Sequence, residues 1–191
     1  NIPAGTLNVT PGDTIQIPFS VTNTGNAPDV VDGSYTSTIL TYEMWIDFDG
    51  NGIIDNGDVL ATDTDGDGYP DTGTLQPGQT MYFIAKAIVP VGTSDLSTDL
   101  LNMVGTSSND NTISDSDSIS VVVHAPILSM IKSVSPTGPQ TPGTVLTYTL
   151  VITNSGTGVA KDLLITDPIP AFTTYVPGSI TMNGVGRTDA I

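Results

Sequence analysis

The chain of 191 residues is long enough for one large domain or for two smaller domains that each bury a core. Its 4 Lys and Arg residues against 20 Asp and Glu residues give a net charge of −16, which repels phosphate backbones and anionic lipids, so nucleic acid and membrane surfaces are not expected partners. There is no cysteine, which excludes disulfides and thiolate chemistry, and no stretch approaches the ~20 apolar residues of a membrane span, so membrane insertion is not expected.

Short runs rich in β-branched and aromatic residues recur along the whole chain, and most of them alternate with polar residues. Such alternation predicts strands, and no segment combines a helical period with helix caps. The expected strands, in chain order, are residues 14–23, 39–48, 79–90, 118–124, 144–154 and 162–167. The sequence therefore predicts an all-β protein.

Four Pro-Gly pairs each precede a strand-like run, and they begin at Pro11, Pro77, Pro142 and Pro177. Proline presets φ at the first corner of a type II turn, and glycine adopts the positive φ that the second corner requires. We therefore expect these pairs to form turns that lead into the strands of a sandwich.

An internal repeat relates the two halves of the chain. PGDTIQIPFSVTNTGNA, from Pro11, aligns without a gap to PGTVLTYTLVITNSGTG, from Pro142, and both copies end in Thr-Asn-x-Gly before diverging. The repeat predicts two related domains, residues 1–124 and 125–191, joined near Pro126, where proline interrupts a continuous apolar pattern.

Residues 47–71 form an acidic insertion in the first domain, with eight aspartates and no Lys or Arg. The first part, DFDGNGIIDNGD, matches the spacing of an EF-type calcium loop, in which ligands stand at positions 1, 3, 5, 7, 9 and 12 and glycine at position 6 permits a sharp turn. The expected ligands are the side chains of Asp47, Asp49, Asn51, Asp55 and Asp58 and the backbone carbonyl of Ile53. Ile54 is expected to point inward and anchor the loop.

The second part, DTDGDGYPD, repeats the pattern and resembles the calcium loops of thrombospondin-type repeats. Its expected ligands are Asp63, Asp65, Asp67, the carbonyl of Tyr69, and Asp71. Position 12 is Thr74, so the last ligand must come from water or from a carboxylate of the first loop, such as Asp58. Strands rather than helices flank both loops, which argues against an opening switch of the calmodulin type.

Most charge runs are simply solvated loops, and that is the alternative here. The repeated alternate spacing, each time with glycine at position 6, favours two calcium ions instead. Magnesium fits less well, because its octahedral sites seldom use this many carboxylates. The use of aspartate for every acidic residue except Glu43 agrees with short ligands in tight loops.

The remaining residues do not predict an enzyme. His124 is the only histidine and lies at the expected joint between the domains, where a packing role is the simpler interpretation. The sequence contains no nucleophile elbow, zinc-protease motif or phosphate loop. We therefore expect neither a catalytic residue nor an organic cofactor.

The second half, with ILSMIKSVSP, PGTVLTYTLVITNSGTGVAKDLLITDPIP and TTYVPGSITMNG, resembles the Ig-like conserved repeat known as the bacterial domain of unknown function eleven family. The resemblance covers about residues 127–184, and the first half resembles a divergent copy of the module. It implies antiparallel Ig-like sandwiches, usually in tandem, on secreted or surface-anchored prokaryotic proteins, without catalytic activity. The second domain stops short of the family pattern, so it is expected either to be cut or to be completed by a neighbouring chain.

These observations predict a non-enzymatic, calcium-stabilised structural subunit of an extracellular surface polymer such as a filament, stalk or sheath. Its expected partners are copies of itself or neighbouring Ig-like repeats. The alternative is an adhesin or accessory ligand-binding module of a large surface protein.

Overall fold

The computed structural model describes residues 2 and 5–188, and every regular element in this part of the chain is a β-strand. The chain forms two compact units, Asn1–Ala160 and Lys161–Ile191. The predicted all-β class is confirmed, and the described residues contain no helix that could cross a bilayer. The division into domains 1–124 and 125–191 stays a prediction.

The first sheet has five strands in the order β1-β9-β8-β3-β6. Their bounds are Thr6–Val9 for β1, Ser114–Val123 for β9, Thr98–Ser107 for β8, Asp29–Thr36 for β3 and Asp71–Leu75 for β6. Neighbouring strands are antiparallel except β1, which runs parallel to β9 and covers only its second half, from Ser120 to Val123. Among the described residues, the first half of β9 pairs with β8 alone, and the Ile2 amide donates to Asp117 beside it.

The second sheet has four strands in the order β2-β7-β4-β5. Their bounds are Thr14–Thr22 for β2, Thr80–Ile88 for β7, Glu43–Asp47 for β4 and Val59–Leu60 for β5. In β2, Ile15 and Ile17 are buried while Thr14 and Gln16 are exposed, as the alternation of the sequence predicts.

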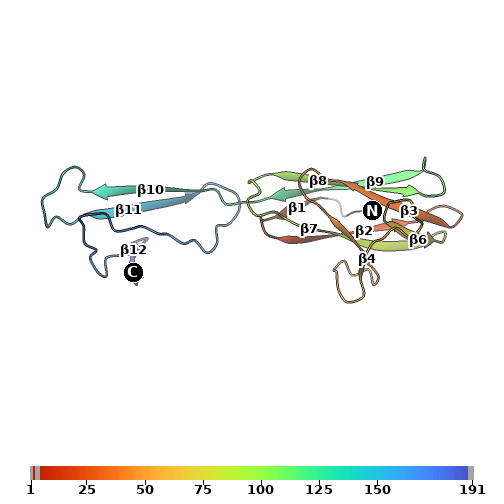
Figure 1. Ribbon diagram of the computed structural model, residues 1–191, viewed down its shortest axis with the longest axis horizontal. Coiled ribbons are helices and arrows are strands. Elements are labelled where there is room, and N and C mark those ends of the chain that lie inside the picture. Colours follow the sequence, from red (N-terminus) through yellow and green to blue (C-terminus); the bar gives the residue numbers. More distant parts are fainter. Residues whose placement is uncertain (1, 3–4, 189–191) are drawn as a thin grey trace. The chain divides into compact units, whose positions relative to one another are not determined.

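The two sheets pack face to face as an Ig-like β-sandwich, with β8 and β9 in one layer and β2 and β7 in the other (Figure 1). One apolar cluster joins them and provides the core. Its members include Ile15, Ile17, Ala85 and Ala87 from the second sheet and Leu101, Met103, Ile119, Val121 and Val123 from the first. Burial of these alternate side chains is the main stabilising contribution to the fold.

The expected strand over residues 39–48 is shorter than predicted, because β4 begins only at Glu43. Five of residues 37–42, all but Thr41, donate instead to the carboxylate of Asp99 on β8, which has no exposed surface. Leu40 and Tyr42 are still buried, but in a loop rather than in a strand. Apolar residues that enter the core from a loop carry the same sequence signal as residues in a strand.

All four Pro-Gly pairs form the expected turns. Gly12, Gly78, Gly143 and Gly178 have φ between 73° and 93°. In each turn the amide after the glycine donates to the carbonyl of the residue before the proline, over 2.9 to 3.3 Å. These are type II turns, and the prediction is confirmed.

The internal repeat is visible in individual hydrogen bonds. Asn23 accepts from the Gly25 amide at 2.9 Å and donates to the Ala27 carbonyl at 2.9 Å. Asn154 does the same with Gly156 at 3.1 Å and Gly158 at 2.8 Å. Both copies of Thr-Asn-x-Gly thus end their strands in one local structure.

The second half contains two hairpins. One pairs β10 (Leu128–Ser135) with β11 (Thr147–Asn154), and the other pairs β12 (Thr181–Met182) with β13 (Val185–Gly186). The strand predicted over residues 162–167 is wrong, because no strand forms there and no neighbouring strand pairs with the segment. High β propensity produces a strand only where a ladder partner exists.

Candidate metal centre

The two acidic loops begin with the same hydrogen bonds. At position 1 of the first loop, Asp47 accepts from the amides of Gly50 and Gly52, both at 2.8 Å. At position 1 of the second loop, Asp63 accepts from the amides three and five residues further on, Gly66 at 2.6 Å and Gly68 at 2.8 Å. All four glycines have positive φ, which lets the backbone curl around the carboxylate.

The correspondence continues through positions 3 and 5. Each of these four side chains accepts from the backbone amide two residues later. The pairs are Asp49 with Asn51, Asn51 with Ile53, Asp65 with Asp67, and Asp67 with Tyr69. The first seven positions of the loops therefore fold alike, as their shared sequence pattern predicts.

The loops differ in the residue that closes them. In the first loop Asp58, at position 12, accepts from the Phe48 amide at position 2 and from the Asp55 amide. In the second loop Asp71, at position 9, accepts from both the amide and the hydroxyl of Thr64 at position 2. The second loop thus closes three residues earlier, which explains why it lacks an acidic residue at position 12.

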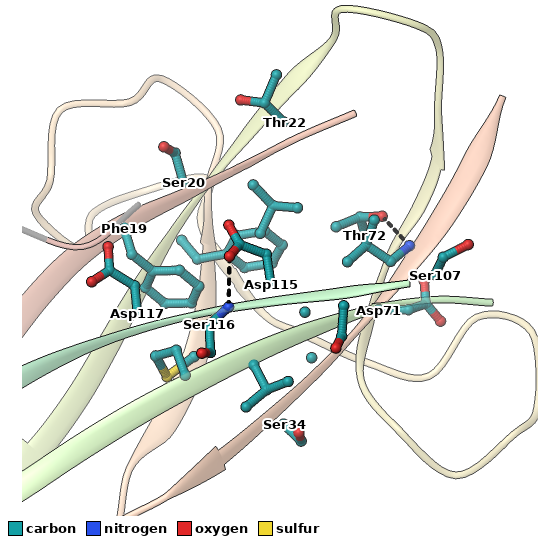
Figure 2. Close-up of a pocket in the computed structure, with 18 of the residues that line it drawn as sticks. Phe19, Ser20, Thr22, Ser34, Asp71, Thr72, Ser107, Asp115, Ser116 and Asp117 are labelled. Carbon is teal, nitrogen blue, oxygen red and sulfur yellow. Dashed lines mark hydrogen bonds between the residues drawn. The ribbon is translucent and has the colours of Figure 1, made fainter. Parts of the chain in front are cut away.

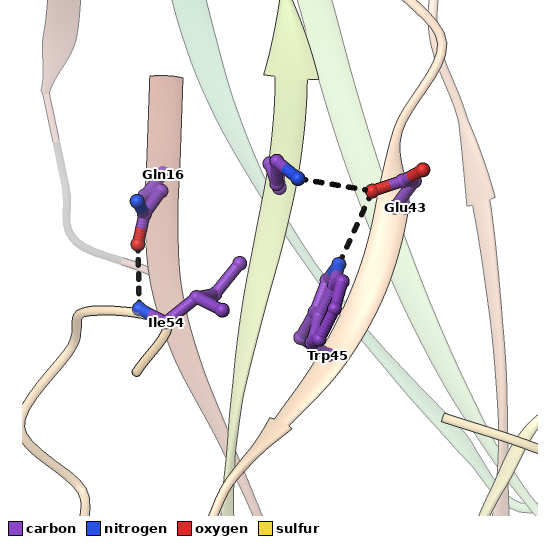
Figure 3. Close-up of polar contacts among 5 residues, drawn as sticks. Gln16, Glu43, Trp45 and Ile54 are labelled. Atoms are coloured by element: carbon purple, nitrogen blue, oxygen red, sulfur yellow. Dashed lines mark hydrogen bonds and ion pairs between the residues drawn. The ribbon is translucent and has the colours of Figure 1, made fainter. Parts of the chain in front are cut away.

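The first loop is anchored on the second sheet. The Ile54 amide donates to Gln16 Oε1 on β2 over 2.7 Å, and Ile54 is half-buried while Ile53 is 60% exposed (Figure 3). In the same view Glu43 accepts from Trp45 and pairs with Lys86 at 3.4 Å. The anchoring role expected of Ile54 is therefore present.

The carboxylates converge mainly in the second loop. Among the described residues, two groups of three aspartates offer oxygens that all lie within 4.8 Å of one another. The groups are Asp63, Asp65 and Asp71, and Asp32, Asp65 and Asp67. Either group could hold a metal ion, and the second loop brings all four of its predicted carboxylates into these groups.

The first loop is less convergent. Its four predicted aspartates form no group of this kind in the described part of the chain. Asp49 and Asp55 nevertheless both accept from the side-chain nitrogen Nδ2 of Asn51, at 2.9 and 3.0 Å, so these three side chains lie together. The carbonyl ligands expected from Ile53 and Tyr69 stay predictions.

Asp32 is the residue that the sequence analysis missed. It lies on β3 directly opposite Asp71 on β6 and is only 8% exposed. Its carboxylate, rather than Asp58 of the first loop, joins the second loop from outside. The available signal was an aspartate in the middle of a strand-like run, DVVDGSY, but only the pairing of β3 with β6 places it beside the loop.

The pKa values of the carboxylates that meet at the second loop are shifted in different directions. Burial is the main cause that raises the pKa of Asp32, and the nearby charges of Asp67, Asp65 and Asp71 raise it further, against a hydrogen bond from Ser108. The Gly66 and Gly68 amides lower the pKa of Asp63. Burial alone would raise the pKa of Asp71, but the hydrogen bonds from Thr64, followed by those from Gly73 and Asp65, together outweigh it and lower that pKa. A cation would relieve the repulsion that Asp32 experiences.

Comparisons with known proteins do not identify a family. No family model and no curated protein matches the chain.

Among solved structures, a family 123 glycoside hydrolase from Clostridium perfringens is 11% identical with a TM-score of 0.42, over 62% of this chain and 22% of that one. A PapD-like domain of human CEP192 is 12% identical with a TM-score of 0.34, over 64% and 82%. The class 5 fimbriae chaperone CfaA is 8% identical with a TM-score of 0.31, over 82% and 67%. The chain thus spans about a fifth of the length of the glycoside hydrolase, and likenesses this distant carry no argument about function.

Proposed function

We propose that this protein is a non-enzymatic structural subunit of an extracellular polymer, stabilised by calcium bound in the two acidic loops. The observation that supports the proposal is the hydrogen-bond pattern that the two loops share, in which the backbone curls around the carboxylate at position 1, together with the converging carboxylates at the second loop. Oxygen ligands in this number, without a nearby Lys or Arg in residues 47–71, suit calcium better than softer metals.

The β10–β11 hairpin supports the polymer part of the proposal. By the internal repeat, β11 corresponds to β2, which pairs with β7 and contributes to a core. In the described residues β11 pairs only with β10, and apolar side chains of the hairpin remain exposed, including Met130 at 55%, Ile131 at 69% and Val151 at 52%. Strands from a neighbouring copy or repeat would cover this surface by β-augmentation.

Electron microscopy of the purified chain with and without calcium tests the proposal. We expect polymers in 1 mM calcium, about the extracellular level, and dispersed particles after chelation. Asp65→Asn, which removes the carboxylate shared by both groups in the second loop, should weaken assembly, whereas the exposed control Asp162→Asn should not. Dispersed particles at every calcium concentration would overturn the polymer.

The second candidate function is that of an accessory ligand-binding module. A cleft in the first sandwich, distinct from the first acidic loop, favours it (Figure 2). Dispersed particles that bind a ligand through this cleft would support it over the polymer.

A further inference from the structure

The acidic insertion contains two Asn-Gly pairs, Asn51–Gly52 and Asn56–Gly57. Asparagine is one of the thermolabile residues, because the backbone nitrogen of the next residue can attack its side-chain carbonyl carbon. Glycine in the next position favours the attack, since it has no side chain to shield its nitrogen. Both pairs have this chemistry in the sequence, so only their contacts in the fold can distinguish them.

Most glycine amides of the insertion are bonded to a carboxylate. Four of them donate to the aspartate at position 1 of their loop over 2.6 to 2.8 Å, Gly50 and Gly52 to Asp47, and Gly66 and Gly68 to Asp63. A backbone nitrogen must lose its proton before it attacks a carbonyl carbon. Removal of a proton that points at a carboxylate would leave two negative charges in contact, so these four nitrogens are protected from reaction.

The Asn51 side chain is also held in place. Its Nδ2 donates to Asp49 and Asp55, at 2.9 and 3.0 Å. The next residue packs on β2, because a Cβ at Gly52 would lie 3.5 Å from the Cβ of Pro18. Asn51 must therefore break two hydrogen bonds to carboxylates before its side chain can turn toward the Gly52 nitrogen.

The pair Asn56–Gly57 lacks all of these restraints. Both residues are exposed, at the corner of a turn that the Asp58 amide closes by donating to the Asp55 carbonyl over 3.3 Å. Among the described residues, none accepts from the Gly57 amide and none bonds to the Asn56 side chain. A Cβ at Gly57 would meet no atom within 4 Å, so its surroundings are open.

We propose that Asn56 is a site of spontaneous deamidation and that Asn51 is protected from the same reaction by the fold. The Gly57 nitrogen bonds to Asn56 Cγ, the Cγ–Nδ2 bond breaks, and ammonia leaves with the proton of the backbone amide. Water then adds to either carbonyl of the cyclic imide. Opening of the new N–Cγ bond gives aspartate, and opening of the original peptide bond gives isoaspartate, whose main chain continues through Cγ.

The isoaspartate product would disturb the closure of the first loop. It adds a methylene group to the main chain between Asp55 and Asp58. Asp58 closes the loop by accepting from the Phe48 amide at 3.1 Å and from the Asp55 amide at 2.9 Å. A longer main chain displaces Asp58 from these donors, so the modification opens the first loop as the protein ages. Only the effect of this opening on calcium rests on the proposed function; the reaction at Asn56 does not.

Incubation of the purified chain without calcium, in mildly alkaline buffer, tests the reaction. Peptide mapping by mass spectrometry follows the conversion of each asparagine and separates aspartate from isoaspartate. We expect Asn56 to convert at least about tenfold faster than Asn51 in the folded chain. In urea the two rates should converge, because the contacts that protect Asn51 are lost. Asp47→Ala, which removes the acceptor of the Gly52 amide, should speed up conversion of Asn51.

Calcium titration of fresh and aged protein tests the consequence. Aged protein should lose binding at the first loop, whereas aged Asn56→Gln should keep it, because glutamine would have to close a larger and slower-forming ring. Equal rates at Asn51 and Asn56 in the folded chain would overturn the inference. So would an Asn56 that converts only in urea. Unchanged calcium binding after full conversion of Asn56 would overturn the opening of the loop, whereas fresh protein that binds no calcium would contradict the proposed function instead.

Discussion

At the scale of single residues, the buried carboxylate of Asp99 holds a loop in place where the sequence predicts a strand. Its carboxylate accepts hydrogen bonds from Ser37, Thr38, Ile39, Leu40 and Tyr42, and these hold residues 37–42 against β8. Burial alone would raise the pKa of Asp99, but these donors, the Ser37 hydroxyl first, outweigh burial and lower it. The ionised form is therefore the one that stabilises the fold.

We predict that Asp99→Asn lowers the free energy of unfolding by about 2–4 kcal/mol. The asparagine side chain replaces one accepting oxygen with an NH2 group, which would face the hydrogen-bond donors of residues 37–42. Because the pKa of Asp99 is lowered on folding, its contribution is complete above the ordinary aspartate pKa of about 3.9 and is lost as the pH falls below that value. Urea unfolding at pH 7 and at about pH 3 measures both effects. The exposed control Asp162→Asn should change stability by less than about 0.5 kcal/mol, and equal losses in the two variants would contradict the prediction.

Gly156 shows how close approach of two backbones selects glycine. A Cβ at this position would lie 2.3 Å from the Ala125 carbonyl oxygen and 2.5 Å from the Ile127 nitrogen. Nearby, Asp95 accepts from the Ala125 amide and the Thr157 hydroxyl, and His124 bonds to Thr157 and Asn8. His124 thus links Asn8 to Thr157, and its packing role stays a prediction.

We expect Gly156→Ala to lower stability by about 1–3 kcal/mol, since the backbone must move apart. Hydrogen exchange at Ala125 and Thr157 should speed up. In Gly186→Ala the new methyl group meets no atom within 4 Å, and φ is not in the left-handed region, so this control should be nearly neutral. Unchanged exchange at Ala125 in Gly156→Ala would show that the contact is not a constraint.

At the scale of elements, the second acidic loop depends on a strand outside it. Asp32 on β3 and Asp71 on β6 are direct neighbours, so the pairing of two strands completes the group of carboxylates. Because burial, and then the charges of Asp67, Asp65 and Asp71, disfavour ionised Asp32, we expect its carboxylate to destabilise the fold without metal and to strengthen metal binding.

This predicts opposite effects of Asp32→Asn in the two states. Without calcium the variant should be slightly more stable than the original chain, by a few tenths to about 1 kcal/mol, because repulsion is relieved. Its second calcium site should bind about tenfold more weakly, since a charged ligand is lost. Calorimetric titration and thermal unfolding measure the two effects, and Asp58→Asn, which changes only the first loop, is the matched control. Loss of stability in both states would indicate a purely structural Asp32.

At the scale of the whole molecule, the net charge of −16 makes the folded chain repel itself, and the acidic insertion concentrates that repulsion. With calcium at about 1 mM and a Kd on the order of 10 μM, each occupied site would stabilise the fold by about 2.7 kcal/mol. We therefore predict that chelation lowers the unfolding temperature by at least about 5 °C. Calcium should restore it and equimolar magnesium should not. An unchanged unfolding temperature after chelation, measured by calorimetry at constant ionic strength, would remove calcium from the account.

Local chemistry in the sequence was enough for several parts of the fold. The Pro-Gly turns, the alternating core of β2 and the matching starts of the acidic loops depend on residues within about ten positions of one another. Such features follow from φ preferences, side-chain alternation and glycine spacing, which the sequence states directly. The same reasoning failed at residues 162–167, where a strand-like segment has no ladder partner.

The sequence alone determined the all-β class, the internal repeat and the places where carboxylates would gather, because each depends on short spacings in the chain. Only the tertiary structure decided that Asp32 joins the second loop, that Asp99 organises residues 37–42, and that the exposed Asp115 and Asp117 border the cavity of the first sandwich (Figure 2). Those three outcomes depend on which strands become neighbours and which face each strand buries. Strand pairing brings together residues that are tens of positions apart, and no local pattern encodes that choice.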